Sequence, residues 1–177
     1  MQLSQRIDSG DQALLLAVDA ALAEAARRSG PWLVCRPGCT PCCMGPFPIT
    51  PLDAHRLRRG LAELAARDPQ RAARIRQRAA AARNEDDEPC PALAPESGLC
   101  ELYAARPIIC RTFGPSVRCG SGGLGICELC FQGASDAEIA ACEVDIDPDD
   151  LESALLKELE QTTGARDDTL VASALAG

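Results

Sequence analysis

Four of the chain's eleven cysteines fall within nine residues, in the segment CRPGCTPCC at positions 35–43. Thiolate sulfur is a soft, anionic ligand that favours zinc, cuprous copper and iron–sulfur clusters over magnesium or calcium. Spacings of two or three residues allow neighbouring sulfurs to converge on one centre. Because large core-forming side chains are also scarce, with only 3% aromatic residues, this segment predicts a fold that a metal centre helps to organise.

The cysteines could instead form disulfides or carry out thiol chemistry. The sequence has neither a signal-peptide pattern nor an apolar run long enough to cross a membrane. We therefore expect a cytoplasmic protein of bacterial type whose thiols are reduced, a setting in which an odd and large number of cysteines favours metal ligation. The formal net charge of −8 argues against general binding to nucleic acid.

Helical patterns flank the cysteine-rich middle of the chain. Capping residues and apolar spacing predict helices over 11–28, from 51 past 64, from 69 to about 83, over 135–142 and from 147 to 164. Helical periodicity disappears between 90 and 132, where prolines and glycines accompany the cysteines. We predict a mainly α fold, a small helical domain around an irregular cysteine-rich metal-binding core. It would span 1–177 as a single domain, with a flexible tail over 165–177.

Adjacent Cys42 and Cys43 add a constraint, because consecutive side chains point in different directions. We expect one of them to be a spectator, or the two to serve separate centres or separate atoms of a polynuclear cluster. Cys35, Cys39 and Cys42 would converge into a nest, and the distant cysteines between 90 and 110 would complete the coordination. A ligand set spread so widely along the chain would make metal binding part of folding.

Three segments resemble the YkgJ-type cysteine cluster family (CxxxCxxCC), which is described as carrying a zinc- or iron-chelating domain. They are CRPGCTPCC, FPITPLDAHRL and CPALAPESGLCELYAARPIICRTFG, and together they cover about residues 35–114. The resemblance implies that the metal ligands are Cys35, Cys39, Cys42, Cys43, Cys90, Cys100 and Cys110. Only spacing supports further ligands in the additional cysteine-rich loop over 115–142, which contains Cys119, Cys127, Cys130 and Cys142.

The sequence leaves the metal open between an iron–sulfur cluster and Zn²⁺. The C-x3-C-x2-C spacing is similar to that of radical SAM enzymes, so a cluster, of the [4Fe–4S] type, is the first expectation. Seven to eleven thiols could equally build two four-ligand zinc sites. Arg106 and Arg111 flank Cys110 and could offset the charge of thiolates, and Tyr103 is expected to pack beside the site.

Other classes of function stay open beside simple metal binding. An iron–sulfur-dependent modifying enzyme is one alternative, and a thiol oxidoreductase that uses Cys127-x2-Cys130 is another. An interaction protein that uses zinc only to hold its shape is a third. The sequence predicts no nucleic-acid or membrane partner and does not identify a protein partner or a substrate.

Overall fold

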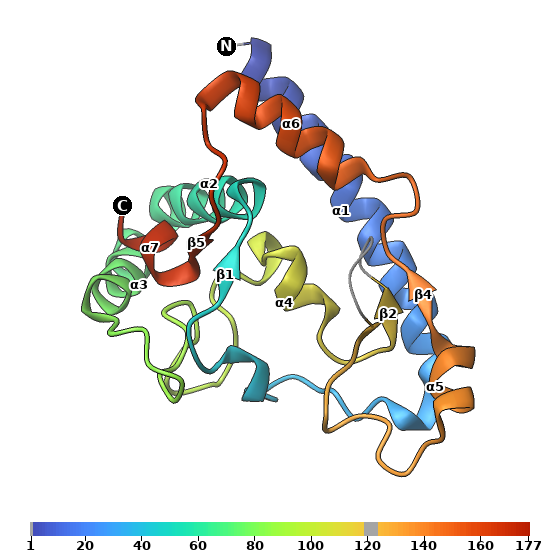
Figure 1. Ribbon diagram of the computed structural model, residues 1–177. Helices are drawn as coiled ribbons and strands as arrows, with labels where there is room; N and C mark the ends of the chain where they lie inside the picture. The colour runs from blue at the N-terminus through green and yellow to red at the C-terminus, as the bar shows by residue number, and fades with distance from the viewer. Residues whose placement is uncertain (1, 119–123) are drawn as a thin grey trace. The chain divides into compact units, whose positions relative to one another are not determined.

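The computed structural model describes residues 2–118 and 124–177. In that part of the chain seven α-helices account for most of the regular structure, and each strand is only two residues long (Figure 1). The predicted mainly α fold is therefore confirmed. The backbone forms two compact units: unit 1 contains residues 1–36 and 111–164, and unit 2 contains 37–110 and 165–177.

Unit 1 is built on the long helix α1 (Gln2–Ser29), which packs along α6 (Leu151–Thr163) (Figure 1). We expected this helix to begin at residue 11, where Asp11 could cap its start, but it begins at Gln2. Gly10 lies inside the helix, where a Cβ atom would come within 2.5 Å of Leu155 Cδ2. The missing side chain at Gly10 therefore lets α6 approach closely.

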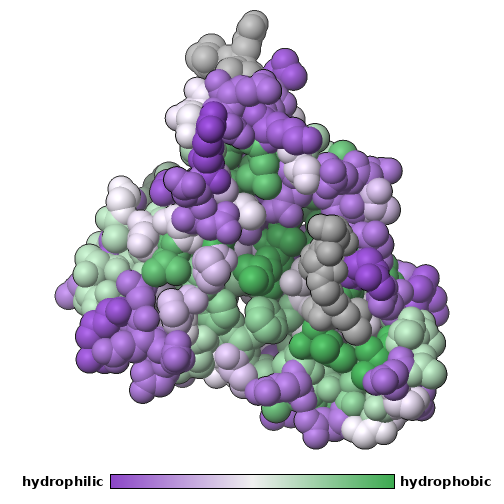
Figure 2. All heavy atoms as spheres, in the orientation of Figure 1, coloured by the Kyte–Doolittle hydropathy of each residue, from purple (hydrophilic) through white to green (hydrophobic). Residues whose placement is uncertain are grey.

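Short elements complete unit 1. A 3₁₀ turn, η1 (Gly30–Trp32), follows α1, and α5 (Asp136–Cys142) begins at Ser135 with a capping box to Glu138. Strand β2 (Val117–Arg118) pairs with β3 (Leu124–Gly125) in antiparallel and with β4 (Val144–Asp145) in parallel orientation. The segment predicted as an additional cysteine-rich loop is thus partly regular. In the view of Figure 2, most residues over α6 are hydrophilic.

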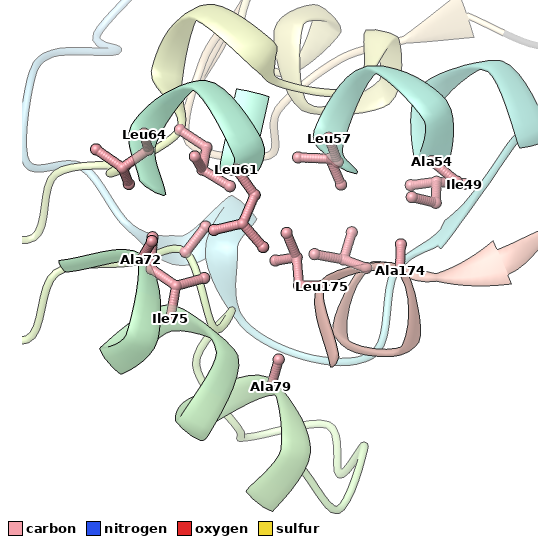
Figure 3. Packing of buried hydrophobic residues seen from close by; sticks show 13 residues of the cluster. Ile49, Ala54, Leu57, Leu61, Leu64, Ala72, Ile75, Ala79, Ala174 and Leu175 are labelled. Carbon is pink, nitrogen blue, oxygen red and sulfur yellow. The ribbon is translucent and has the colours of Figure 1, made fainter. Parts of the chain in front are cut away.

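Unit 2 contains α2 (Pro51–Arg67) and α3 (Pro69–Ala81), both of which begin where the sequence predicts. The Thr50 hydroxyl accepts a hydrogen bond from the Asp53 amide at 3.2 Å, and Asp68 accepts one from the Arg71 amide at 2.9 Å. Buried leucines of α2 face the small apolar side chains of α3 (Figure 3). These contacts form the apolar core of unit 2.

The end of the chain is ordered in the structure, whereas we expected a flexible tail over 165–177. Strand β5 (Thr169–Leu170) pairs antiparallel with β1 (Pro48–Ile49), and α7 (Val171–Ala176) packs against α2 and α3. Leu175 is fully buried between those helices (Figure 3). The physical reason is the i, i+3, i+4 spacing of Val171, Ala174 and Leu175, which gives even a short helix one apolar face.

The described helices include none that is both long and apolar enough to cross a membrane.

Candidate metal centre

Six cysteines belong to unit 2, and they lie on three separate segments of the chain. A 3₁₀ turn, η2 (Pro41–Cys43), and the loop before it carry the first group, and α4 (Ile108–Thr112) carries the last. Cys90 and Cys100 lie on the second segment, at the two ends of a turn. Each of these thiols is half-buried: Cys39, Cys42, Cys43, Cys90, Cys100 and Cys110.

Backbone hydrogen bonds hold the first two segments together. The Cys90 amide donates to the Cys43 carbonyl at 2.8 Å, and the Gly45 amide donates to the Glu88 carbonyl at 2.8 Å. The turn that follows Cys90 then returns, and Leu93 forms a β-bridge with Cys100. Cys43, Cys90 and Cys100 are therefore neighbours in the fold, although the first and the last are 57 positions apart in the sequence.

A buried ion pair fixes the third segment. Asp53, near the start of α2, accepts a hydrogen bond from the Ile108 amide at 3.0 Å and also pairs with Arg56. The side chains of both charged residues are almost completely buried. This contact attaches α4, and with it Cys110, to α2. The role of this pair was not predicted from the sequence, although the i, i+3 spacing of Asp53 and Arg56 in the segment LDAHRL is a signal for it.

The thiols of η2 interact directly. The Cys42 thiol donates a hydrogen bond to the Cys43 sulfur, which raises the pKa of Cys42 and lowers that of Cys43. We expected these adjacent side chains to diverge, but the tight turn, closed by a bond from the Cys43 amide to the Thr40 carbonyl at 2.8 Å, brings them together.

The other thiols share one electrostatic environment. Burial raises the pKa of Cys90 to about 11 and that of Cys110 to about 12, and it also raises the pKa of Cys100. Negative charge on Cys90 or Cys100 raises the pKa of Cys110 further. Negative charge on Cys90, Cys100 or Cys110 likewise tends to raise the pKa of Cys43, although the hydrogen bond from Cys42 lowers it more. Five thiols from three segments therefore lie close enough to influence one another's charge.

These thiols are suitable ligands for a thiophilic metal, but their sulfur atoms do not surround one common position. Among the residues that the structure describes, no three His, Cys, Asp or Glu side chains are gathered closely enough to hold a metal ion. Metal binding would therefore require these thiols to lose protons and to converge. Cys35, which the sequence assigned to the same nest as Cys39 and Cys42, belongs to unit 1.

Of the residues predicted to surround the metal, Arg106 and Tyr103 belong to unit 2 and Arg111 belongs to unit 1. The positive charge of Arg106 lowers the pKa of Cys42 and Cys100, but the net shift of both pKa values is upwards. The Arg106 guanidinium lies 3.6 Å from the centre of the Tyr103 ring. Tyr103 itself is 63% exposed. Arg111 belongs to unit 1, where it forms an ion pair with Asp19 of α1 at 2.6 Å.

Unit 1 holds the remaining described thiols. Cys130 and Cys142 are buried in one small apolar cluster, Cys127 is half-buried beside it, and Cys35 is exposed. The side chains of Cys127 and Cys130 are hydrogen-bonded to each other. Cys119, the other predicted ligand of the cysteine-rich loop, lies outside the described residues.

A comparison with protein families decides the class of this protein. The family model "CxxCxxCC: Putative zinc- or iron-chelating domain" matches residues 34–145, which is more than half of the chain. The chain belongs to this family. The match confirms the resemblance seen in the sequence and extends it, because all eleven cysteines lie within the matched range. A search of curated proteins and a search of solved structures each found no match.

The family is described as a zinc- or iron-chelating domain. The family supports metal ligation in general and leaves the type of metal open.

Proposed function

We propose that the protein binds an iron–sulfur cluster in unit 2. The observation that carries this proposal is the shared electrostatic environment of five half-buried thiols from three chain segments. Iron–sulfur clusters are held by Cys thiolates, and a cluster presents several metal atoms to its ligands. The hydrogen-bonded pair Cys42 and Cys43 fits a polynuclear centre better than a single ion, because both sulfurs lie on the same side of the chain.

Four thiols are the proposed ligands, and they are Cys43, Cys90, Cys100 and Cys110. Cys42 and Cys39 supply alternative ligands on the same loop. When bound, an iron–sulfur cluster supplies one-electron transfer or a structural cross-link. Arg106 would offset part of the thiolate charge through its electrostatic interaction with Cys42 and Cys100. The partial burial of the thiols would limit access of water and oxidants to the centre.

Anaerobic purification followed by iron, sulfide and zinc analysis tests the proposal. We expect a brown protein with stoichiometric iron and sulfide in the natural chain. The double substitution Cys90→Ser and Cys110→Ser should remove both, because it deletes ligands from two of the three segments. Cys142→Ser is the matched control: it removes a buried thiol from unit 1 and should keep the iron. A colourless protein with tightly bound zinc in place of iron would contradict the cluster.

A further inference from the structure

We propose that Cys127 and Cys130, in the loop before α5, form a dithiol that exchanges with low-molecular-weight disulfides of the glutathione-disulfide class. Both thiols belong to unit 1, and the exchange needs neither the centre proposed in unit 2 nor a bound metal. This activity therefore goes beyond the proposed function and does not depend on it.

The two cysteines stand at the first and last positions of one tight turn. The Cys130 amide donates to the Cys127 carbonyl at 2.9 Å, which is the bond that closes a β-turn. Such a turn keeps its end Cα atoms less than about 7 Å apart, and a disulfide spans about 4.4–6.8 Å between Cα atoms. The Cys130 thiol also donates a hydrogen bond to the Cys127 sulfur, so the two sulfurs face each other. The geometry of the turn therefore suits a disulfide between them.

The two thiols differ in their access to a dissolved substrate. Cys130 is only 4% exposed and lies in the apolar cluster with Phe131, whereas Cys127 is half-buried at the edge of that cluster. Leu129, between them in the sequence, is 40% exposed and adds an accessible apolar side chain to the same turn. Cys127 is therefore the thiol that meets the substrate, and Cys130 is the thiol that attacks second.

Backbone amides surround the sulfur of the buried cysteine. The loop before α5 runs beside the segment that follows α1, and the Phe131 amide donates to the Trp32 carbonyl at 3.1 Å (Figure 1). On that segment, the amides of Val34 and Cys35 donate hydrogen bonds to the Cys130 sulfur. Amide donors stabilise the negative charge that a sulfur carries when it attacks or leaves in thiol–disulfide exchange. The fold thus supports the charged form of Cys130 that the second step needs.

The exchange has two steps, and both balance in atoms and electrons. In the first, the Cys127 thiolate attacks one sulfur of the substrate disulfide and forms a mixed disulfide, while the other half of the substrate leaves as a thiolate. In the second, the Cys130 thiol gives up its proton to water and attacks the Cys127 sulfur, and the remaining half leaves as a thiolate. The dithiol loses two electrons and two protons, and the substrate becomes two thiols.

Glutathione disulfide, added to the complete chain purified anaerobically with the metal that it carries, tests this site. Unreacted thiols are alkylated, and the chain is then cleaved after Glu128, which separates Cys127 from Cys130 unless a disulfide joins them. We expect the two fragments to stay linked and to separate on reduction. Cys142→Ser is the matched control: it removes a thiol of the same cluster that donates to the Arg28 carbonyl at 3.2 Å, and it should keep the link.

Single substitutions distinguish the two thiols. Cys130→Ser removes the second step, so the mixed disulfide of glutathione with Cys127 should accumulate to about tenfold or more above its level in the natural chain. Cys127→Ser should leave almost no glutathione on Cys130, because that side chain is buried. Equal uptake of glutathione by the two variants would overturn the proposal.

Further outcomes separate this site from the centre in unit 2. The Cys90→Ser and Cys110→Ser variant should form the same disulfide, because the pair lies in unit 1. A disulfide from Cys127 to any cysteine other than Cys130 would overturn the proposal. A chain that resists glutathione disulfide, and that loses bound zinc when Cys127 and Cys130 are both replaced by serine, would also overturn it, since the two thiols would then be metal ligands.

Discussion

At the scale of single residues, the cysteines depend on charged neighbours that are not ligands. Asp53 accepts a hydrogen bond from the Ile108 amide and forms an ion pair with Arg56. One carboxylate of α2 therefore binds both the buried Arg56 guanidinium and the segment that carries Cys110. A buried ion pair of this kind adds little net stability, but it fixes the position of the groups that it joins. We regard Asp53 as a positioning residue for the proposed centre in unit 2.

Replacing Asp53 tests this role. Asp53→Ala should lower the free energy of unfolding by about 3–5 kcal/mol, because it removes the buried carboxylate that pairs with the Arg56 charge. It should also reduce metal content, since the segment of Cys110 loses its attachment to α2. Urea unfolding and metal analysis measure the two effects. Glu63→Ala on the same helix is the control, because its contact with Arg59 at 4.0 Å is exposed and should contribute less than about 1 kcal/mol.

The pH dependence of metal binding follows from the thiol pKa values. Burial raises the pKa of Cys90 to about 11 and that of Cys110 to about 12, so both thiols hold their protons at neutral pH in the metal-free protein. Coordination must release those protons, and the apparent metal affinity should rise by roughly tenfold per pH unit for each thiol deprotonated. Zinc competition titrations at several pH values, with proton release measured by an indicator, check this. Binding that is independent of pH would contradict the assignment of these two thiols.

The raised pKa values of Cys90 and Cys110 also make the stability of the metal-free fold depend on pH, and this stability falls as the pH rises. A pKa raised above the ordinary thiol value of 9.0 means that the folded state holds its proton more tightly than the unfolded state. The resulting stabilisation is fully present below pH 9.0 and is lost as the pH rises through the pKa values of about 11 and about 12. Metal-free protein should therefore unfold more readily in alkali, while metal binding at moderate pH becomes stronger.

At the scale of elements, the end of the chain closes the core of unit 2. Leu175 in α7 has no exposed surface and packs with the buried residues of α2 and α3 (Figure 3). Leu175→Ala should lower the free energy of unfolding by about 2–5 kcal/mol, because it leaves a cavity among helices that are already formed. Leu16→Ala in α1 is the control, since Leu16 is 69% exposed and its loss should change stability by less than about 0.5 kcal/mol. Equal effects of the two substitutions in urea unfolding would show that α7 adds nothing to the core.

Capping residues in the sequence predicted the starts of α2, α3 and α5, but the sequence did not predict how the two ends of the chain pack. The Thr50, Asp68 and Ser135 caps were readable because a cap and its amide partner are only three residues apart in the sequence. The first turns of α1 were not predicted, because the close approach of Gly10 to Leu155 joins residues that are distant in sequence. The burial of α7 depends likewise on its packing against α2 and α3, which are distant in sequence.

At the scale of the whole molecule, the cysteines divide between two compact units. The sequence predicted the cysteine-rich segments and the pairing of the region around 42 with the region from 90 to 110. It could not predict that Cys35 and Cys39 belong to different units, because the division follows from tertiary contacts such as the bond between the Cys90 amide and the Cys43 carbonyl. Spacing shows which sulfurs are able to share a centre, and the fold decides which of them are neighbours.

In unit 2, the buried apolar core and the thiols are formed by different residues. The apolar core of unit 2 consists of leucines, isoleucines, valine and alanines from α2, α3, α7 and adjacent segments, and Cys90 and Cys100 only pack against its edge. No cysteine is among the fully buried residues of this core. The expectation that metal binding is part of folding stays a prediction. The segment that carries Cys90 and Cys100 contributes Ala92 and Leu102 to this core, and backbone hydrogen bonds join it to the loop of Cys43.

Metal removal should accordingly loosen the thiol-bearing loops of unit 2 and leave its helices in place. After chelation, the far-UV circular dichroism should change little, because α2, α3 and α7 are held by apolar packing. Hydrogen exchange of the Cys90 and Glu101 amides should accelerate by roughly tenfold or more, while the Ile75 amide in the buried part of α3 keeps its protection. The Cys90→Ser and Cys110→Ser variant should reproduce this pattern without a chelator. Collapse of the helical signal on chelation would instead show that the metal is required for the core, and that the apolar cluster alone does not hold the helices together.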